Sequence, residues 1–194
     1  MKIEEDRFVT LRERQLVTII GNSMAFAVGM ADVDFRQQAL SEYLTEYQKI
    51  INKLAEPPEA GVSERRRLLK YGILLDDIFP GSDNSFTSVL GVQGVKDFRN
   101  TLIGIFGECI SAEPSRMNSD PSRTSWPVHT VLRPSEVISL ITVYGLQDGV
   151  SNDYKRAAEI LTTHPQTVYQ HTSSSLHFLK RRKELQSFRE KLQG

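Results

Sequence analysis

At residues 132–182 the chain reads LRPSEVISLITVYGLQDGVSNDYKRAAEILTTHPQTVYQHTSSSLHFLKRR, the most strongly patterned part of the sequence. Apolar residues at helical spacing predict a first helix that follows Leu132, since Pro134 suits a first turn and Gly145 suits the end of a helix. The residues expected on its inner face are Val137, Leu140, Ile141 and Tyr144. A polar connection, GLQDGVSN, follows this helix.

Two further helices are predicted after this connection. Asn152 or Asp153 is a suitable N-cap for a helix over 154–161, in which Ala157 and Ala158 are small enough for close helix crossing. A tight turn over 162–164 leads to Pro165, the expected first residue of a last helix that runs to Arg182, or on to Leu192. The residues expected on one face of the last helix are Val168, Ser175, Leu176 and Leu179.

This order of helices and turns is typical of a helix-turn-helix, which lays its last helix in the major groove of double-stranded DNA. Gln, Ser and Thr side chains bond base edges or phosphates, Tyr reaches the backbone, and clustered Lys and Arg neutralise phosphate. The side chains expected to contact DNA are Gln166, Thr167, Tyr169, Gln170, Ser173, Ser174, His177, Lys180, Arg181 and Arg182.

The same stretch resembles region 4 of bacterial sigma factors and the LuxR-type helix-turn-helix. Leu132 and Glu136 correspond to the residues that open the sigma motif, and YGLQDG at 144–149 is similar to its (F/Y)GL and acidic-Gly connection. Thr167, Val168 and His171 are similar to the LuxR-type signature. The resemblance implies a DNA-binding module. Because residues 1–131 show no aromatic, basic region for promoter melting, we expect a transcriptional regulator and not a sigma factor.

The preceding part of the chain predicts helices and no strands, which gives an all-α fold class: an N-terminal helical bundle plus a C-terminal helix-turn-helix domain. Helices are expected at 8–30, 35–54, 63–79 and 97–111, with SVLGVQGV (88–95) as a turn before the last of these. We therefore expect a dimerisation or sensing domain over 1–111, a Pro- and Ser-rich linker over 112–130 and the DNA-binding domain over 131–194. The bundle could sense a ligand, hold a partner or pair two subunits, and a homodimer is the simplest of these for a DNA-binding protein.

Charge is placed unevenly along the chain. The 194 residues contain 24 Lys or Arg and 24 Asp or Glu, but nine basic and six acidic residues follow His129, so this part carries a net charge of +3. The single cysteine, Cys109, lies in an apolar run and is expected to be a buried thiol, and it excludes a disulfide within the chain. No signal pattern or membrane-length apolar run is visible, so a cytoplasmic protein with no membrane association is expected.

Other functions have less support in the sequence. The three histidines of the C-terminal part, His164, His171 and His177, lack the i, i+4 spacing of a helical metal pair, so no metal site is expected. No catalytic constellation or nucleotide loop is recognised, and neither an enzyme nor a cofactor is expected. Two alternatives stay open: plain helix packing without a site, and an interaction module that binds RNA polymerase or a sigma or anti-sigma factor.

Overall fold

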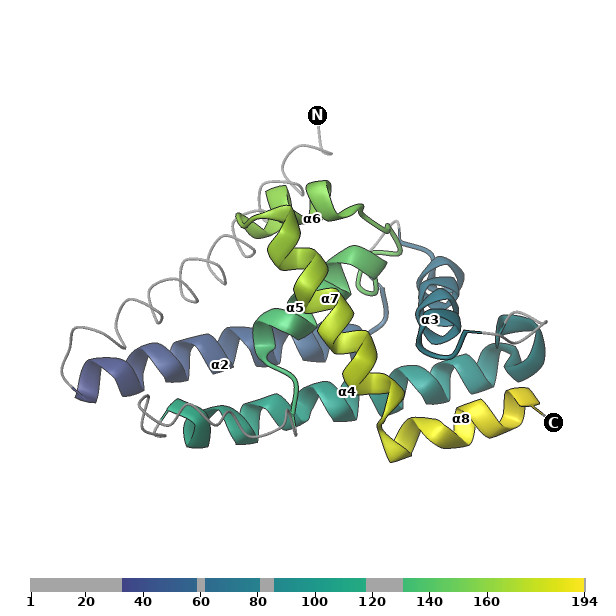
Figure 1. Ribbon diagram of the computed structural model, residues 1–194, viewed down its shortest axis with the longest axis horizontal. Coiled ribbons are helices and arrows are strands. Elements are labelled where there is room, and N and C mark those ends of the chain that lie inside the picture. The colour runs from purple at the N-terminus through teal and green to yellow at the C-terminus, as the bar shows by residue number, and fades with distance from the viewer. Residues whose placement is uncertain (1–32, 59–61, 81–85, 118–130, 194) are drawn as a thin grey trace.

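The computed structural model describes residues 33–58, 62–80, 86–117 and 131–193, and within these ranges every regular element is a helix (Figure 1). The all-α fold class is thereby confirmed. The helices are α2 (Val33–Ala55), α3 (Glu64–Ile78), α4 (Phe86–Met117), α5 (Pro134–Tyr144), α6 (Tyr154–Leu161), α7 (Pro165–Lys180) and α8 (Lys183–Gln193). None of these helices is both long and apolar enough to cross a membrane. The helix expected at 8–30 lies outside the described residues.

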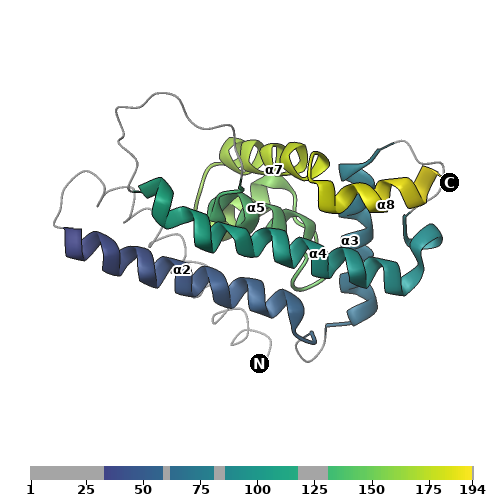
Figure 2. The ribbon, with the colours of Figure 1, turned by 90° about the horizontal axis from the view of Figure 1, so that it is seen from below.

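Two long helices form the base of the molecule. α2 and α4 run antiparallel and side by side (Figures 1 and 2). α5 contacts α4, α7 packs on α5, and α6 packs on both α5 and α7. α3 packs on α4 and also contacts α5 and α7, and α8 lies along α4 (Figure 2). The arrangement brings the first and last described helices onto the same central helix.

A buried arginine closes the end of α2. Arg67 of α3 is only 1% exposed, and its guanidinium donates hydrogen bonds to the carbonyl oxygens of Leu54 (2.8 Å) and Glu56 (2.9 Å). The last carbonyls of a helix have no partner within the helix, so this side chain supplies the missing donors. Arg67 thus differs from its neighbours Arg65 and Arg66, which are both exposed to solvent.

The bounds of α4 differ from those predicted. The helix begins at Phe86, whereas residue 97 was the expected start. Within its described residues the helix is interrupted at Gly91, where φ is 63° and ψ is −177°, values that lie outside the helical region. It also continues past Ser111 to Met117, so the first six residues of the expected linker are helical. Residues 118–130, including Trp126, lie outside the described residues.

The basic run that was expected to end α7 lies instead at a break between two helices. α7 ends at Lys180, and α8 begins at Lys183. Leu185 and Phe188 of α8 are buried, and the Phe188 ring meets that of Phe98 on α4 edge-on, with centroids 5.6 Å apart. The chain turns at Arg181–Arg182, and this change of direction allows Leu185 and Phe188 to be buried against α4.

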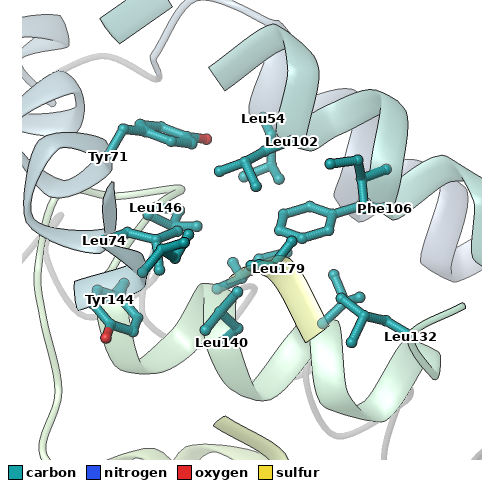
Figure 3. Close-up of a cluster of buried hydrophobic side chains, with 14 of the residues drawn as sticks. Leu54, Tyr71, Leu74, Leu102, Phe106, Leu132, Leu140, Tyr144, Leu146 and Leu179 are labelled. Atoms are coloured by element: carbon teal, nitrogen blue, oxygen red, sulfur yellow. The ribbon is translucent and has the colours of Figure 1, made fainter. Parts of the chain in front are cut away.

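One continuous hydrophobic core joins the elements on both sides of the expected linker. Leu54 of α2 and Phe106 of α4 belong to the same buried cluster as Leu140 of α5 and Leu179 of α7 (Figure 3). Tyr47 belongs to the same core, and its hydroxyl group donates a hydrogen bond of 2.8 Å to the carbonyl oxygen of Phe106. The base and the three helices above it are therefore packed as one body.

Candidate nucleic-acid interface

The connection between α5 and α6 is held by a glycine and an asparagine. Gly145 ends α5 in the left-handed conformation, with φ 65° and ψ 40°, as predicted from its position. Asn152 turns the chain back, since its backbone N–H donates to the carbonyl oxygen of Val143 (2.9 Å) and its side-chain amide donates to that of Thr142 (2.8 Å). These bonds fix the point at which α6 begins.

α6 begins and packs as its sequence predicts. Of the two candidate N-caps, Asp153 fills the role, and its carboxylate accepts the backbone N–H of Arg156 at 2.7 Å. Ala157 and Ala158 are both fully buried, which confirms that small side chains lie where α6 packs against its neighbours. Thr162 then adopts a left-handed conformation (φ 51°), and the ring of His164 caps α7 by accepting the N–H of Gln166.

The inner side of α7 packs against α5 through both apolar and polar contacts. Val168 and Leu179 are fully buried, as predicted. Between them, the Ser139 hydroxyl of α5 lies 3.1 Å from Nδ1 of His171. The Ser175 hydroxyl lies 3.3 Å from the carbonyl oxygen of Glu136. Burial lowers the pKa of His171; the carboxylate of Glu136 opposes this effect, and the charge of nearby Arg133 adds to it.

The outer side of α7 is a polar surface, which we call the α7 face. Its members recur every three or four residues, so they form one stripe along the helix. The predicted contact residues that are exposed on it are Gln166, Tyr169, Gln170, Ser173, Ser174, His177 and Lys180. Thr167 is half-buried at its edge. The structure therefore gathers on one surface most of the side chains that the sequence selected.

The basic residues beyond α7 differ in how they are engaged. Arg182 is half-buried and lies 2.5 Å from a carboxylate oxygen of Glu108 and 2.8 Å from one of Glu184. Burial disfavours its charge, but the hydrogen bonds to these carboxylates outweigh that effect and raise its pKa. Lys180, Arg181 and Lys183 are exposed, so the positive charge that faces solvent at this end belongs mainly to these three residues.

A tyrosine that the sequence analysis did not select, Tyr154, extends the α7 face onto α6 by pairing with Tyr169. Tyr154 and Tyr169 meet edge-on with ring centroids 5.5 Å apart, and they remain 39% and 48% exposed. Lys155 and Arg156 are exposed beside Tyr154, and Arg156 pairs with Glu159 at 2.9 Å. A tyrosine in the first position of a short helix with two basic residues after it was the available signal.

Tyr144 ties these helices to α3. Its hydroxyl donates to a carboxylate oxygen of Asp77 at 2.6 Å, and burial together with this carboxylate raises the pKa of Tyr144. On the same side of α3, the aliphatic stem of Arg66 lies against Gly149. The surface of α3 that carries Asp77 and Arg66 thus adjoins the connection between α5 and α6.

Within the described ranges no cluster of three or more His, Cys, Asp or Glu side chains could hold a metal ion. The side chain of Cys109 lies outside the part of the chain described at this level. Comparison of the chain with protein-family models, with curated proteins and with solved structures finds no match.

Proposed function

We propose that the protein is a cytoplasmic, DNA-binding transcriptional regulator in which α6, the turn over 162–164 and α7 act as a helix-turn-helix. The observation that carries the proposal is the two-sidedness of α7. One side is fixed to α5 by buried contacts, and the other presents a continuous stripe of hydrogen-bonding side chains to solvent. A helix of 16 residues with that division is suited to the major groove, where amide and hydroxyl groups read base edges.

The roles of the side chains follow from their positions. Gln166, Gln170 and Ser173 lie along the middle of the α7 face and are the proposed readers of base edges. Lys180 and Arg181 are the proposed phosphate contacts, because they are exposed. Arg182 is assigned mainly to holding α8 against α4, since Glu108 and Glu184 already accept its hydrogen bonds.

The first test is selection from a random-sequence DNA duplex pool with the purified full chain, followed by affinity measurements at two salt concentrations. We expect one enriched sequence motif. Each of Lys180→Ala and Arg181→Ala should weaken binding to every sequence and reduce the slope of log affinity against log salt by about 1. Gln170→Ala should change the preferred bases and leave the slope unaltered.

Lys49→Ala is the matched control, because Lys49 is an exposed cation on α2, a helix outside the proposed interface. Its affinity and salt slope should equal those of the unmodified chain. Absence of DNA binding at low salt would refute the proposal. Binding without any enriched motif would leave a non-specific binder and refute the assignment of Gln166, Gln170 and Ser173.

One observation favours a second candidate, a module that binds RNA polymerase or a sigma or anti-sigma factor. Val150, Tyr154 and Tyr169 are all exposed large side chains, and exposed aromatic groups are enriched at protein interfaces. If this function holds, Tyr154→Ala should abolish co-elution with purified polymerase or sigma factor, and the duplex pool should show no retention. The two candidates therefore predict opposite outcomes in the same pair of assays.

A further inference from the structure

The outer side of α3 carries apolar side chains that nothing in the described chain covers. Leu69 and Ile73 are each 46% exposed, although they lie one turn apart on a helix whose other side is completely buried. Single exposed apolar side chains are common on protein surfaces. Here two of them are adjacent, and charged residues flank them at both ends. We call this surface the α3 face; its members are Arg65, Arg66, Leu69, Ile73, Asp76 and Asp77.

The charges of the α3 face are separated along the helix. Arg65 and Arg66 lie one turn before Leu69, and Asp76 and Asp77 lie about one turn after Ile73. At 3.6 residues per turn all six members fall within roughly 120° of the helix circumference. The face is therefore basic at one end, apolar in the middle and acidic at the other end.

This order is complementary to itself when a second copy of the helix runs antiparallel. With the two-fold axis at the level of residue 71 on the exposed side of α3, Leu69 of each copy lies opposite Ile73 of the other. Arg66 then lies in the same layer as Asp76 of the other copy, and Arg65 adds positive charge at the same end. A two-fold interface repeats each of these pairs twice, so a single surface supplies both the apolar contact and its flanking ion pairs.

We propose that the α3 face is a homodimer interface, in which two copies of the chain pair their α3 helices antiparallel. Val150 extends the apolar surface, because it is 49% exposed and follows Gly149, against which the stem of Arg66 lies. An interface built mainly on one helix of 15 residues is small, so we expect a reversible dimer with a dissociation constant in the micromolar range. The inference does not depend on DNA binding, because it rests on α3 alone.

The test is sedimentation equilibrium of the full chain without DNA, over a range of protein concentrations. Arg66→Glu should weaken the dimer, since it places two like-charged pairs in the interface, and we expect the dissociation constant to rise roughly tenfold. Asp76→Arg should have the same effect. An equimolar mixture of these two variants should form a heterodimer, and the double variant should recover the homodimer because its charges are exchanged and again complementary.

Two further variants separate loss of pairing from loss of folding. Ile73→Lys places a charge opposite the apolar side chain of the partner and should also give a monomer, with a thermal unfolding midpoint close to that of the unmodified chain. Arg189→Glu is the matched control on α8, where an exposed arginine lies outside the α3 face, and it should leave the dissociation constant unchanged. The proposal is overturned by a chain that stays monomeric at its highest soluble concentration. A dimer that is insensitive to both Arg66→Glu and Ile73→Lys would overturn it equally, and neither result bears on DNA binding.

Discussion

Gly145 occupies a backbone conformation and a space that no other residue can share. Its φ is 65°, and a Cβ atom built on it would lie 2.1 Å from the carbonyl oxygen of Val150. That oxygen belongs to the backbone of the α5–α6 connection, so it cannot move aside as a flexible side chain would. The sequence predicted the helix end at Gly145 correctly, but not this contact, because Val150 approaches only once the connection has folded back.

Gly145→Ala should therefore lower the free energy of unfolding by about 3 kcal/mol, from backbone strain and the clash with Val150 together. Urea denaturation monitored by circular dichroism measures this change. The matched control is Gly104→Ala on α4, where a Cβ atom would meet nothing within 4 Å. Alanine is the better helix former, so this control should raise the free energy of unfolding by about 0.5–1 kcal/mol. Equal effects of the two substitutions would contradict the assignment.

His171 should make the packing of α7 against α5 sensitive to pH. Burial lowers its pKa in the folded chain, with the Glu136 carboxylate opposing and Arg133 reinforcing the shift. The unfolded chain has an unperturbed histidine pKa of about 6.5 and therefore takes up the proton first as the pH falls. The free energy of unfolding should be highest above that value and should decline as the pH falls through it toward the lower folded pKa.

The measurement is the urea midpoint at pH 8 and at pH 5 for the unmodified chain and for His171→Gln. The glutamine variant retains a polar group near Ser139 but cannot titrate, so its midpoint should fall less between the two pH values. Other titrating groups contribute equally to both proteins and cancel in the comparison. An identical fall in the two proteins would exclude His171 as the source of this pH dependence.

At the scale of the elements, the sequence predicted the helices whose ends are marked locally. Gly145 and Asp153 carry the information for their helix ends in their own chemistry, and α5 and α6 have the expected bounds. The start of α4 and the separation of α7 from α8 were not predictable in this way. Both depend on contacts with distant residues, such as the pairing of Arg182 with Glu108, which no local pattern encodes.

α8 should contribute to stability through its aromatic contact with α4. Phe188 is 6% exposed and packs edge-on against Phe98, so Phe188→Ala leaves a cavity and should lower the free energy of unfolding by about 3 kcal/mol. Thermal or urea denaturation of the full chain measures the loss. Glu190→Ala on the exposed side of the same helix should change it by less than about 0.5 kcal/mol. Similar values for the two variants would mean that α8 is not docked on α4 as described.

At the scale of the whole molecule, the candidate interface was more predictable than the body that supports it. Solvent-facing residues of α7 follow from helical periodicity alone, so the stripe from Gln166 to Lys180 could be found in the sequence. The core could not, because it is formed by residues such as Phe106 and Leu140, which belong to one buried cluster although they are distant in the chain. The α3 face was missed for a related reason: its complementarity appears only when the buried side of the helix is known.

The shared core also has an evolutionary consequence. A DNA-binding module that carries its own core can be exchanged between proteins by recombination at a linker. Here a cut before Val131 would separate Leu140 and Leu179 from Phe106 and Leu54, and α8 from the helix on which it lies. We therefore expect the described helices on the two sides of such a cut to be inherited together, because neither set keeps its buried cluster without the other.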